Sequence, residues 1–350
     1  MPGMAVEEPD LASTQSAERR FASIAILWLS IALIVSAALL MWLAGIKSAH
    51  FSPVLAGYMM LSLWCALAIA LFFQLAAMMR HRRWQLDVRA PWLLVATLLA
   101  GTTLPVFELF KQRILPARGF PFDPALAALD RFLFFGRDGW EVTHALFGSL
   151  GMTLLIDRLY ALWIPLMFVF PAVTVMIIGD IRQRVRILAA WLASWILIAG
   201  LSAWLFASAG PVYYVTLVGP DAGFAAFNAH FAAMADAARA QGPVLINFDL
   251  QALLLRGWQS GVEGNAAAGG ISAMPSMHVA MASLFAMAGF AHSRALGWVF
   301  TLYACLIWIG SIHLGWHYAT DGIVGFAMMA GLWVAAGRLI LTDKNPLPKA

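Results

Sequence analysis

Long apolar runs with few charges recur along this chain, and they constrain its fold more than any other feature. An α-helix of about 20 apolar residues crosses a hydrocarbon layer roughly 30 Å thick, and eight runs approach or exceed that length. Of the 350 residues, 62% are hydrophobic and 11% are charged, whereas a soluble domain carries roughly 25% charged residues. The sequence therefore predicts an all-α, polytopic bundle with about eight transmembrane helices, at residues 22–43, 54–79, 91–110, 159–179, 187–209, 271–291, 296–312 and 317–341.

The basic residues of the short connections predict the orientation of this bundle. With eight spans, the clusters around residues 19–20, 80–89, 182–186, 294 and 338–349 all lie on one side, and the positive-inside rule assigns that side to the cytoplasm. The net charge of +4 follows from these scattered clusters, so we expect a membrane partner and no nucleic acid. We predict a multi-pass integral membrane protein with both termini in the cytoplasm.

This orientation divides the chain into one membrane domain, residues 21–342, and two cytoplasmic tails, residues 1–20 (disordered) and 343–350. Two long segments, 111–158 and 210–270, then face the periplasmic, lumenal or extracellular side. The first reads as interfacial or re-entrant helices, and the second contains an alanine-rich amphipathic run near residues 222–240.

Two short stretches place ionisable side chains at the predicted outer ends of spans. Ala273-Met-Pro-Ser-Met-His278 begins the sixth span, and Ser311-Ile-His-Leu-Gly-Trp-His-Tyr-Ala-Thr-Asp321 joins the last two. Pro275 suits the first turn of a helix. The N–H groups of Ser276, Met277 and His278 would then form an anion site at the helix end.

His317 and Asp321 are four residues apart, so on one helix they share a face and can form a hydrogen bond. A carboxylate bound to one imidazole nitrogen fixes the tautomer and leaves the other nitrogen free to attack. His278 supplies a second imidazole for acid catalysis. Each element alone has a structural interpretation, an interfacial hydrogen bond or a helix start, but ionisable residues at membrane depth are usually functional.

At the first stretch the chain resembles the type-2 phosphatidic acid phosphatase superfamily, whose members typically carry Pro-Ser-Gly-His near the outer end of a helix. Pro275, Ser276 and His278 match this motif, and Met277 replaces its glycine. The resemblance implies an all-helical enzyme with a six-helix phosphatase-like core.

The second family motif, Ser-Arg-x5-His-x3-Asp, is matched in part. His317 and Asp321 have the right spacing, but Gly310 and Ser311 replace its serine and arginine. The run from His317 to Asp321 is closer to the His-Tyr-x-x-Asp pattern of the branch containing fungal inositol phosphorylceramide synthases. The resemblance implies that His317 forms a phosphohistidine, with Asp321 as its orienting carboxylate and His278 as the acid for the leaving oxygen.

The cations that would hold the phosphate are the poorest match. Family phosphatases use Lys-x6-Arg-Pro just before the first motif; Lys111 and Arg118 have this spacing but lie a full helix pair too early, so chance explains the match more easily. Arg256 and His313 are further candidates. Ser276 and the neighbouring backbone at Met277 complete the expected phosphate site.

Three functions are consistent with these motifs. The leading one is a lipid phosphotransferase that transfers a phosphate-containing head group to a lipid alcohol, without a metal or other cofactor. The alternative is a phosphatase for phosphatidic acid or a polyprenyl (pyro)phosphate, in which water is the acceptor. A metal-dependent membrane hydrolase built from His278, His313, His317 and Asp321 is the third, and a transporter is disfavoured. The sequence leaves the oligomeric state open.

Overall fold

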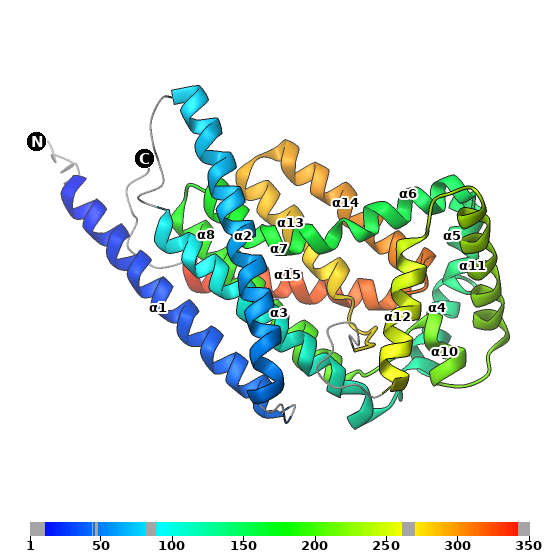
Figure 1. The fold of residues 1–350 in the computed structure, drawn as a ribbon. Helices are drawn as coiled ribbons and strands as arrows, with labels where there is room; N and C mark the ends of the chain where they lie inside the picture. Colours follow the sequence, from blue (N-terminus) through cyan, green and yellow to red (C-terminus); the bar gives the residue numbers. More distant parts are fainter. Residues whose placement is uncertain (1–10, 44, 46–47, 82–88, 261–269, 342–350) are drawn as a thin grey trace, which may run out of the picture.

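The computed structural model describes residues 11–43, 45, 48–81, 89–260 and 270–341 (Figure 1). All regular structure in these residues is helical, which confirms the predicted all-α class. The predicted tail 343–350 and the first ten residues lie outside the described part. Residues 11–20, which the sequence analysis placed in a disordered tail, form the first turns of a helix.

The helices pack as long membrane-length elements joined at one end by a group of shorter ones (Figure 1). In chain order they are α1 (Leu11–Leu43), α2 (Ser48–His81), α3 (Ala90–Arg118), α4 (Asp123–Leu133), α5 (Gly139–Phe147), α6 (Leu150–Ala161), α7 (Trp163–Ile177), α8 (Ile181–Ser194), the π-helix η1 (Trp195–Ser202), α9 (Ala203–Leu205), α10 (Pro211–Leu217), α11 (Ala222–Ala240), α12 (Ile246–Ser260), α13 (Met277–His292), α14 (Arg294–His313) and α15 (Ala319–Leu341).

Within the described residues, seven segments are long and apolar enough to cross a membrane. They are Ser16–Leu43, Pro53–Met79, Ala90–Gln112, Leu150–Ile177, Ile181–Leu205, Arg294–His313 and Ala319–Leu341. The remaining predicted span, the sixth at residues 271–291, corresponds to α13, which is apolar but has only 16 residues. The chain therefore has the architecture of a multi-pass integral membrane protein.

Two predicted boundaries differ from the observed ones. The fourth candidate span begins at Leu150 rather than residue 159, because Leu162 keeps a helical conformation between α6 and α7 and its N–H donates to the carbonyl of Arg158 (3.0 Å). The sixth begins at Met277 rather than residue 271. Here the N–H of Ala273 bonds to the carbonyl of Ser208 (3.0 Å) and holds the preceding segment outside the helix.

The two long segments between spans fold into α4 and α5, and into α10, α11 and α12. These helices gather at one end of the bundle, while the start of α1 and the end of α15 lie at the other (Figure 1). The alanine-rich run predicted near residues 222–240 is α11. These shorter helices therefore form a single cap over the ends of α13 and α15.

The core of the bundle surrounds α13, which packs against α14, α15 and α8. Its residues from Val279 to Phe285 are all buried, in contrast to α1 and α2, where Trp28, Trp42 and Trp64 each expose more than half of their surface. Large exposed aromatic side chains on long helices fit a hydrocarbon environment. The enclosed end of α13 is where both sequence motifs meet.

Candidate active site

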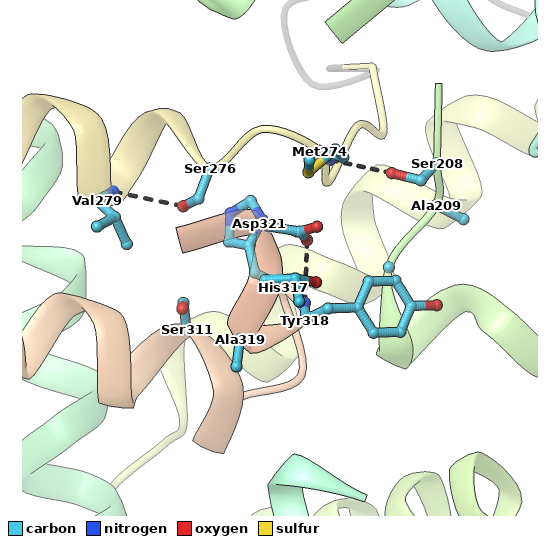
Figure 2. Close-up of polar contacts among 12 residues, drawn as sticks. Ser208, Ala209, Met274, Ser276, Val279, Ser311, His317, Tyr318, Ala319 and Asp321 are labelled. Carbon is cyan, nitrogen blue, oxygen red and sulfur yellow. Dashed lines mark hydrogen bonds and ion pairs between the residues drawn. The ribbon is translucent and has the colours of Figure 1, made fainter. Parts of the chain in front are cut away.

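The first motif forms the start of α13. Ser276 is the N-cap residue, and its Oγ accepts a hydrogen bond from the N–H of Val279 (3.4 Å, Figure 2). Pro275 precedes the cap, so the expectation that it occupies the first turn is wrong. The N–H of Ser276 donates to the backbone carbonyl of Asp321 (3.0 Å). In the described structure, the N–H groups of Met277 and His278 have no acceptor, which leaves them available to an anion.

The second motif forms a tight connection between α14 and α15. The carbonyl of Ser311 accepts hydrogen bonds from the N–H groups of Trp316 (2.9 Å) and His317 (3.1 Å). Gly315 turns the chain with φ of +71°, and a Cβ there would overlap the ring of Phe227. This turn folds the chain back so that His317 faces the start of α13.

His317 and Asp321 lie together, although not on one helix as predicted. His317 is two residues before α15, and Asp321 is in its first turn. Nδ1 of His317 is 3.4 Å from Oδ2 of Asp321, and that same oxygen accepts a hydrogen bond from the N–H of Tyr318 (3.0 Å, Figure 2). The hydrogen bond from the backbone therefore fixes the carboxylate beside the imidazole.

The imidazole of His317 is neutral at ordinary pH. Burial, reinforced by the positive charge of Lys111, lowers the pKa of His317 to about 3, although a hydrogen bond to the backbone of Ala273 opposes this shift. The tautomer that carries its proton on Nδ1, 3.4 Å from Oδ2 of Asp321, has an unprotonated Nε2. This is the state that a nucleophilic imidazole requires.

His278 is the second imidazole of the site. Its ring centroid is 5.7 Å from that of His317. The ring also packs on Tyr160 (4.8 Å) and Trp163 (4.2 Å), and the indole N–H of Trp163 donates to the backbone carbonyl of His278 (3.1 Å). These contacts come from α6 and α7, and they fix the orientation of the His278 ring.

Both imidazoles line one cavity of about 300 Å³. Its walls come from α2, α3, α7, η1 and α12 as well as α13, and most of the lining is apolar. The main polar or charged side chains in its lining are Tyr58, Glu108, Lys111, Tyr160, Tyr213, Asn247, Ser272, His278 and His317.

Lys111 is the only candidate cation of the sequence analysis that lines this cavity. Its charge acts on both His278 and His317, even though it lies in α3, far from either motif along the chain. The structure does not bring the other two basic candidates into the cavity. Arg118 lies over the ring of Trp204 at the outside of the bundle, and Arg256 is exposed on α12.

His313 is buried but does not line the cavity. Its Nε2 is 2.9 Å from Oγ1 of Thr153, and its ring stacks on that of His144 at 3.8 Å. Nδ1 of His144 is in turn 3.1 Å from Nε2 of the exposed His230. Among the residues that the structure describes, no three His, Cys, Asp or Glu side chains are placed to hold a metal ion. The interpretation as a metal site therefore has no structural support.

Two carboxylates of α4, to which no role was predicted from the sequence, hold the turn that carries His317. Asp130 accepts hydrogen bonds from the N–H groups of Ala319 (2.7 Å) and Thr320 (3.1 Å) at the start of α15. Asp123 accepts one from the hydroxyl of Tyr318 (2.9 Å). Burial raises the pKa of Asp130 to about 6, although its backbone hydrogen bonds oppose this. The seven-residue spacing of the two acids, two helical turns, was the signal for their shared face.

These features together define an integral membrane enzyme with a buried imidazole–carboxylate pair, a second imidazole and a lysine around one cavity. Residues 124–335, more than half of the chain, match the family model described as the PAP2 superfamily. The chain therefore belongs to the PAP2 superfamily of membrane phosphatases and phosphotransferases. No curated protein and no solved structure matches it. The match includes both motifs and all of α4 except its first residue, Asp123, and it excludes α1 to α3 with Lys111.

Proposed function

We propose that this protein is a lipid phosphotransferase that moves a phosphate-containing head group from a phospholipid to a lipid alcohol through a phosphohistidine at His317. The observation that carries this proposal is the cavity, because helices of membrane length form much of its wall. Its apolar lining from α2, α3 and α7 is suited to a lipid, and its polar end holds both imidazoles.

In the first step, Nε2 of His317 attacks the phosphorus of the donor and forms a P–N bond. The bond from phosphorus to the lipid oxygen breaks, and His278, which takes up a proton when the anionic phosphate binds beside it, gives that proton to the leaving oxygen. In the second step, the hydroxyl of the acceptor attacks the same phosphorus, His278 takes the hydroxyl proton, and the P–N bond breaks. Asp321 holds the His317 ring and stabilises its positive charge while the intermediate exists.

Charge on the phosphate oxygens is balanced by Lys111 and by the N–H groups of Met277 and His278. Phosphoryl transfer is promoted mainly by positioning and by positive charge around these oxygens. Lys111 supplies the cation that the motifs lack, since Gly310 and Ser311 stand where the family carries serine and arginine. Its position beside both imidazoles supports this role.

A lipid alcohol rather than water is the acceptor, because α12 forms part of the cavity wall next to the second motif, where the indole N–H of Trp316 donates to Oδ1 of Asn247 (2.9 Å). Asn247 and Leu250 of α12 belong to the lining. Asp157 holds this helix by accepting hydrogen bonds from the N–H groups of Ile246 (2.9 Å) and Asn247 (2.8 Å). Exclusion of water protects a reactive intermediate from hydrolysis. The His-Tyr-x-x-Asp pattern at residues 317–321 also favours the transferase branch over the phosphatases.

The test is product analysis with purified enzyme in detergent or vesicles. With a radiolabelled phospholipid donor alone, acid quench should trap a labelled enzyme and release little free phosphate or free head-group phosphate. Addition of a lipid alcohol should discharge the label into a new phospholipid. Rapid release into water that no lipid alcohol changes would instead establish the phosphatase.

We further propose that the active site faces the non-cytoplasmic side and that both termini are cytoplasmic. The support is the one-sided distribution of basic connections, together with the common location of the start of α1 and the end of α15 opposite the cap (Figure 1). Reporter fusions after residue 350 and within residues 240–245 should report opposite sides. The same side for both would overturn this orientation.

A further inference from the structure

The cavity lining contains a second charged group of α3, the side chain of Glu108, one helical turn from Lys111. Glu108 lines the same cavity from the same face of α3, because residues three apart on a helix are neighbours. The rise of the helix places it about 4.5 Å further along the axis. Glu108 is nearer the middle of the span Ala90–Gln112 than Lys111 is. It therefore lies on the membrane side of the phosphate site.

The carboxylate of Glu108 is held in place. It interacts with the ammonium of Lys111 and accepts a hydrogen bond from the side chain of Gln112. It also acts electrostatically on Tyr58 of α2, across the cavity. A carboxylate accepts several hydrogen bonds and donates none, so Glu108 can still accept one from a ligand in the cavity.

Trp195 of η1 lines the same cavity as Glu108. Its ring centroid is 4.9 Å from that of Phe107, the residue next to Glu108. The side chain is 2% exposed, and its indole N–H has no acceptor among the described residues. A buried donor without a partner is costly, and such a group in a cavity wall points to an acceptor on a ligand.

We propose that Glu108 and Trp195 form the subsite for the polar backbone of the lipid, and that they select its chemistry. This inference rests on the proposed transferase function. Trp195 donates to an acyl carbonyl, which donor and acceptor lipids share. Glu108 accepts from a hydroxyl or amide N–H beside the reacting hydroxyl, which only a suitable acceptor carries. The acceptor class is therefore an acylated alcohol with a second hydrogen-bond donor.

The reacting hydroxyl of the acceptor binds beside the two imidazoles and not at Glu108. Lys111 and His317 hold the phosphorus, so the attacking oxygen lies at their level and its proton goes to His278. Glu108, a helical turn away, binds the neighbouring donor and moves no proton. The carboxylate acts as a specificity-determining group, separate from the group-transfer step.

The experiment compares two acceptors of equal chain length, a monoacylglycerol with a second hydroxyl and a diacylglycerol without one. Wild-type enzyme, loaded from a saturating phospholipid donor, should have the higher kcat/KM with the monoacylglycerol. Glu108→Gln should reduce this preference by about tenfold, because a hydrogen bond to a charged carboxylate becomes one to a neutral amide oxygen. Asp236→Asn, at an exposed carboxylate, is the matched control.

Trp195→Phe gives the complementary result. It should raise KM for the phospholipid donor and for both acceptors by several-fold, since all carry the acyl carbonyl. Trp191→Phe is its control: Trp191 is equally buried one turn earlier, its indole N–H also lacks a partner in the described residues, and it does not line the cavity. Equal effects of the Trp191 and Trp195 variants would overturn the carbonyl contact.

These experiments distinguish failure of the proposed subsite from failure of the proposed transferase function. If wild-type enzyme forms a phosphoenzyme and transfers it to a lipid alcohol, but Glu108→Gln leaves the acceptor preference unchanged, the subsite is wrong and the transferase stands. If no label is trapped and no lipid alcohol is modified, the transferase itself fails.

Discussion

Two groups of imidazoles lie near the end of α14, and they differ in what surrounds them. His278 and His317 face a cavity that also contains a lysine. His144, His230 and His313 instead contact one another and the surrounding protein: Nε2 of His144 bonds to the carbonyl of His313 (2.9 Å), and the rings of these two residues stack. The first group faces space for a ligand, whereas the second stabilises the junction between α5, α11 and α14.

This difference shows that residue type alone does not identify a catalytic histidine. His313 is four residues before His317 in the sequence and is also buried, yet only His317 lines the cavity. The turn at Gly315 separates them and directs their side chains to opposite faces. The following predictions test this division.

The largest effect should come from His317→Asn. Without the nucleophile, turnover should fall by at least about a thousandfold, as for the loss of a catalytic nucleophile in general. Acid quench with labelled donor should trap no phosphoenzyme. Circular dichroism and gel filtration in detergent check that the variant is folded; near-normal turnover by a folded variant would contradict the phosphohistidine.

Lys111→Met should follow, with a loss of roughly a hundredfold in kcat/KM, because one positive group at the phosphate oxygens is removed. Arg118→Met, whose guanidinium packs on Trp204 outside the cavity, should stay within about twofold. Initial rates at varied donor concentration measure both. Equal losses in the two variants would mean that Lys111 has no special role at the phosphate.

Asp130→Asn should cost about tenfold in kcat with little change in donor KM. The amide has a single acceptor oxygen, so it loses part of the support for the first turn of α15, which carries Asp321. Its effect on the pH profile separates positioning from general destabilisation, since the wild-type carboxyl titrates at about pH 6 and the amide does not. A profile unchanged by the substitution would show that Asp130 is only structural.

The low pKa of His317 should make the stability of the folded protein sensitive to acid. Its pKa is about 3 when folded and about 6.5 when unfolded, so below pH 6.5 the unfolded chain binds a proton that the folded chain does not. The stabilising contribution is therefore complete above pH 6.5 and is lost progressively as pH falls towards 3. The midpoint temperature of thermal unfolding, measured in detergent at pH 7, 5.5 and 4.5, should fall more steeply with decreasing pH for wild type than for His317→Asn. Parallel slopes would contradict the low pKa.

The smallest effect on activity should come from the other imidazole group. His144→Phe keeps the ring stacking on His313 and removes the hydrogen bonds, so we expect a loss of about 1 kcal/mol in stability and less than about threefold in turnover. Chemical unfolding and steady-state kinetics measure the two separately. A hundredfold loss of turnover would place this group in the reaction.

Much of the fold follows from local sequence, but the composition of the site follows only in part. The apolar runs predict the membrane-length helices, and the His317–Asp321 spacing predicts the pair. The start of α13 is set by pairing with Ser208, a contact between distant segments that no local pattern contains. Likewise, the position of Lys111 depends on how α3 packs against the motif helices, and spacing along the chain does not encode that packing.

The two acids of α4 are a different case, because their signal was present in the sequence. Asp123 and Asp130 share one face of an amphipathic helix whose opposite face exposes Leu129 and Phe132. A surface helix usually buries its apolar face and exposes its charged face. In α4 the acidic residues are buried and large apolar residues are exposed. The reversal indicates that the acids bind backbone N–H groups rather than water.

The cavity wall includes Ile164, which is 43% exposed on α7. A lipid that enters there never leaves the bilayer, so encounter with the enzyme is diffusion in two dimensions. The rate should then depend on the mole fraction of substrate among the surrounding lipids and detergent rather than on its bulk concentration. Dilution with inert detergent at constant substrate concentration would slow the enzyme, and product would return to the leaflet that supplied the donor.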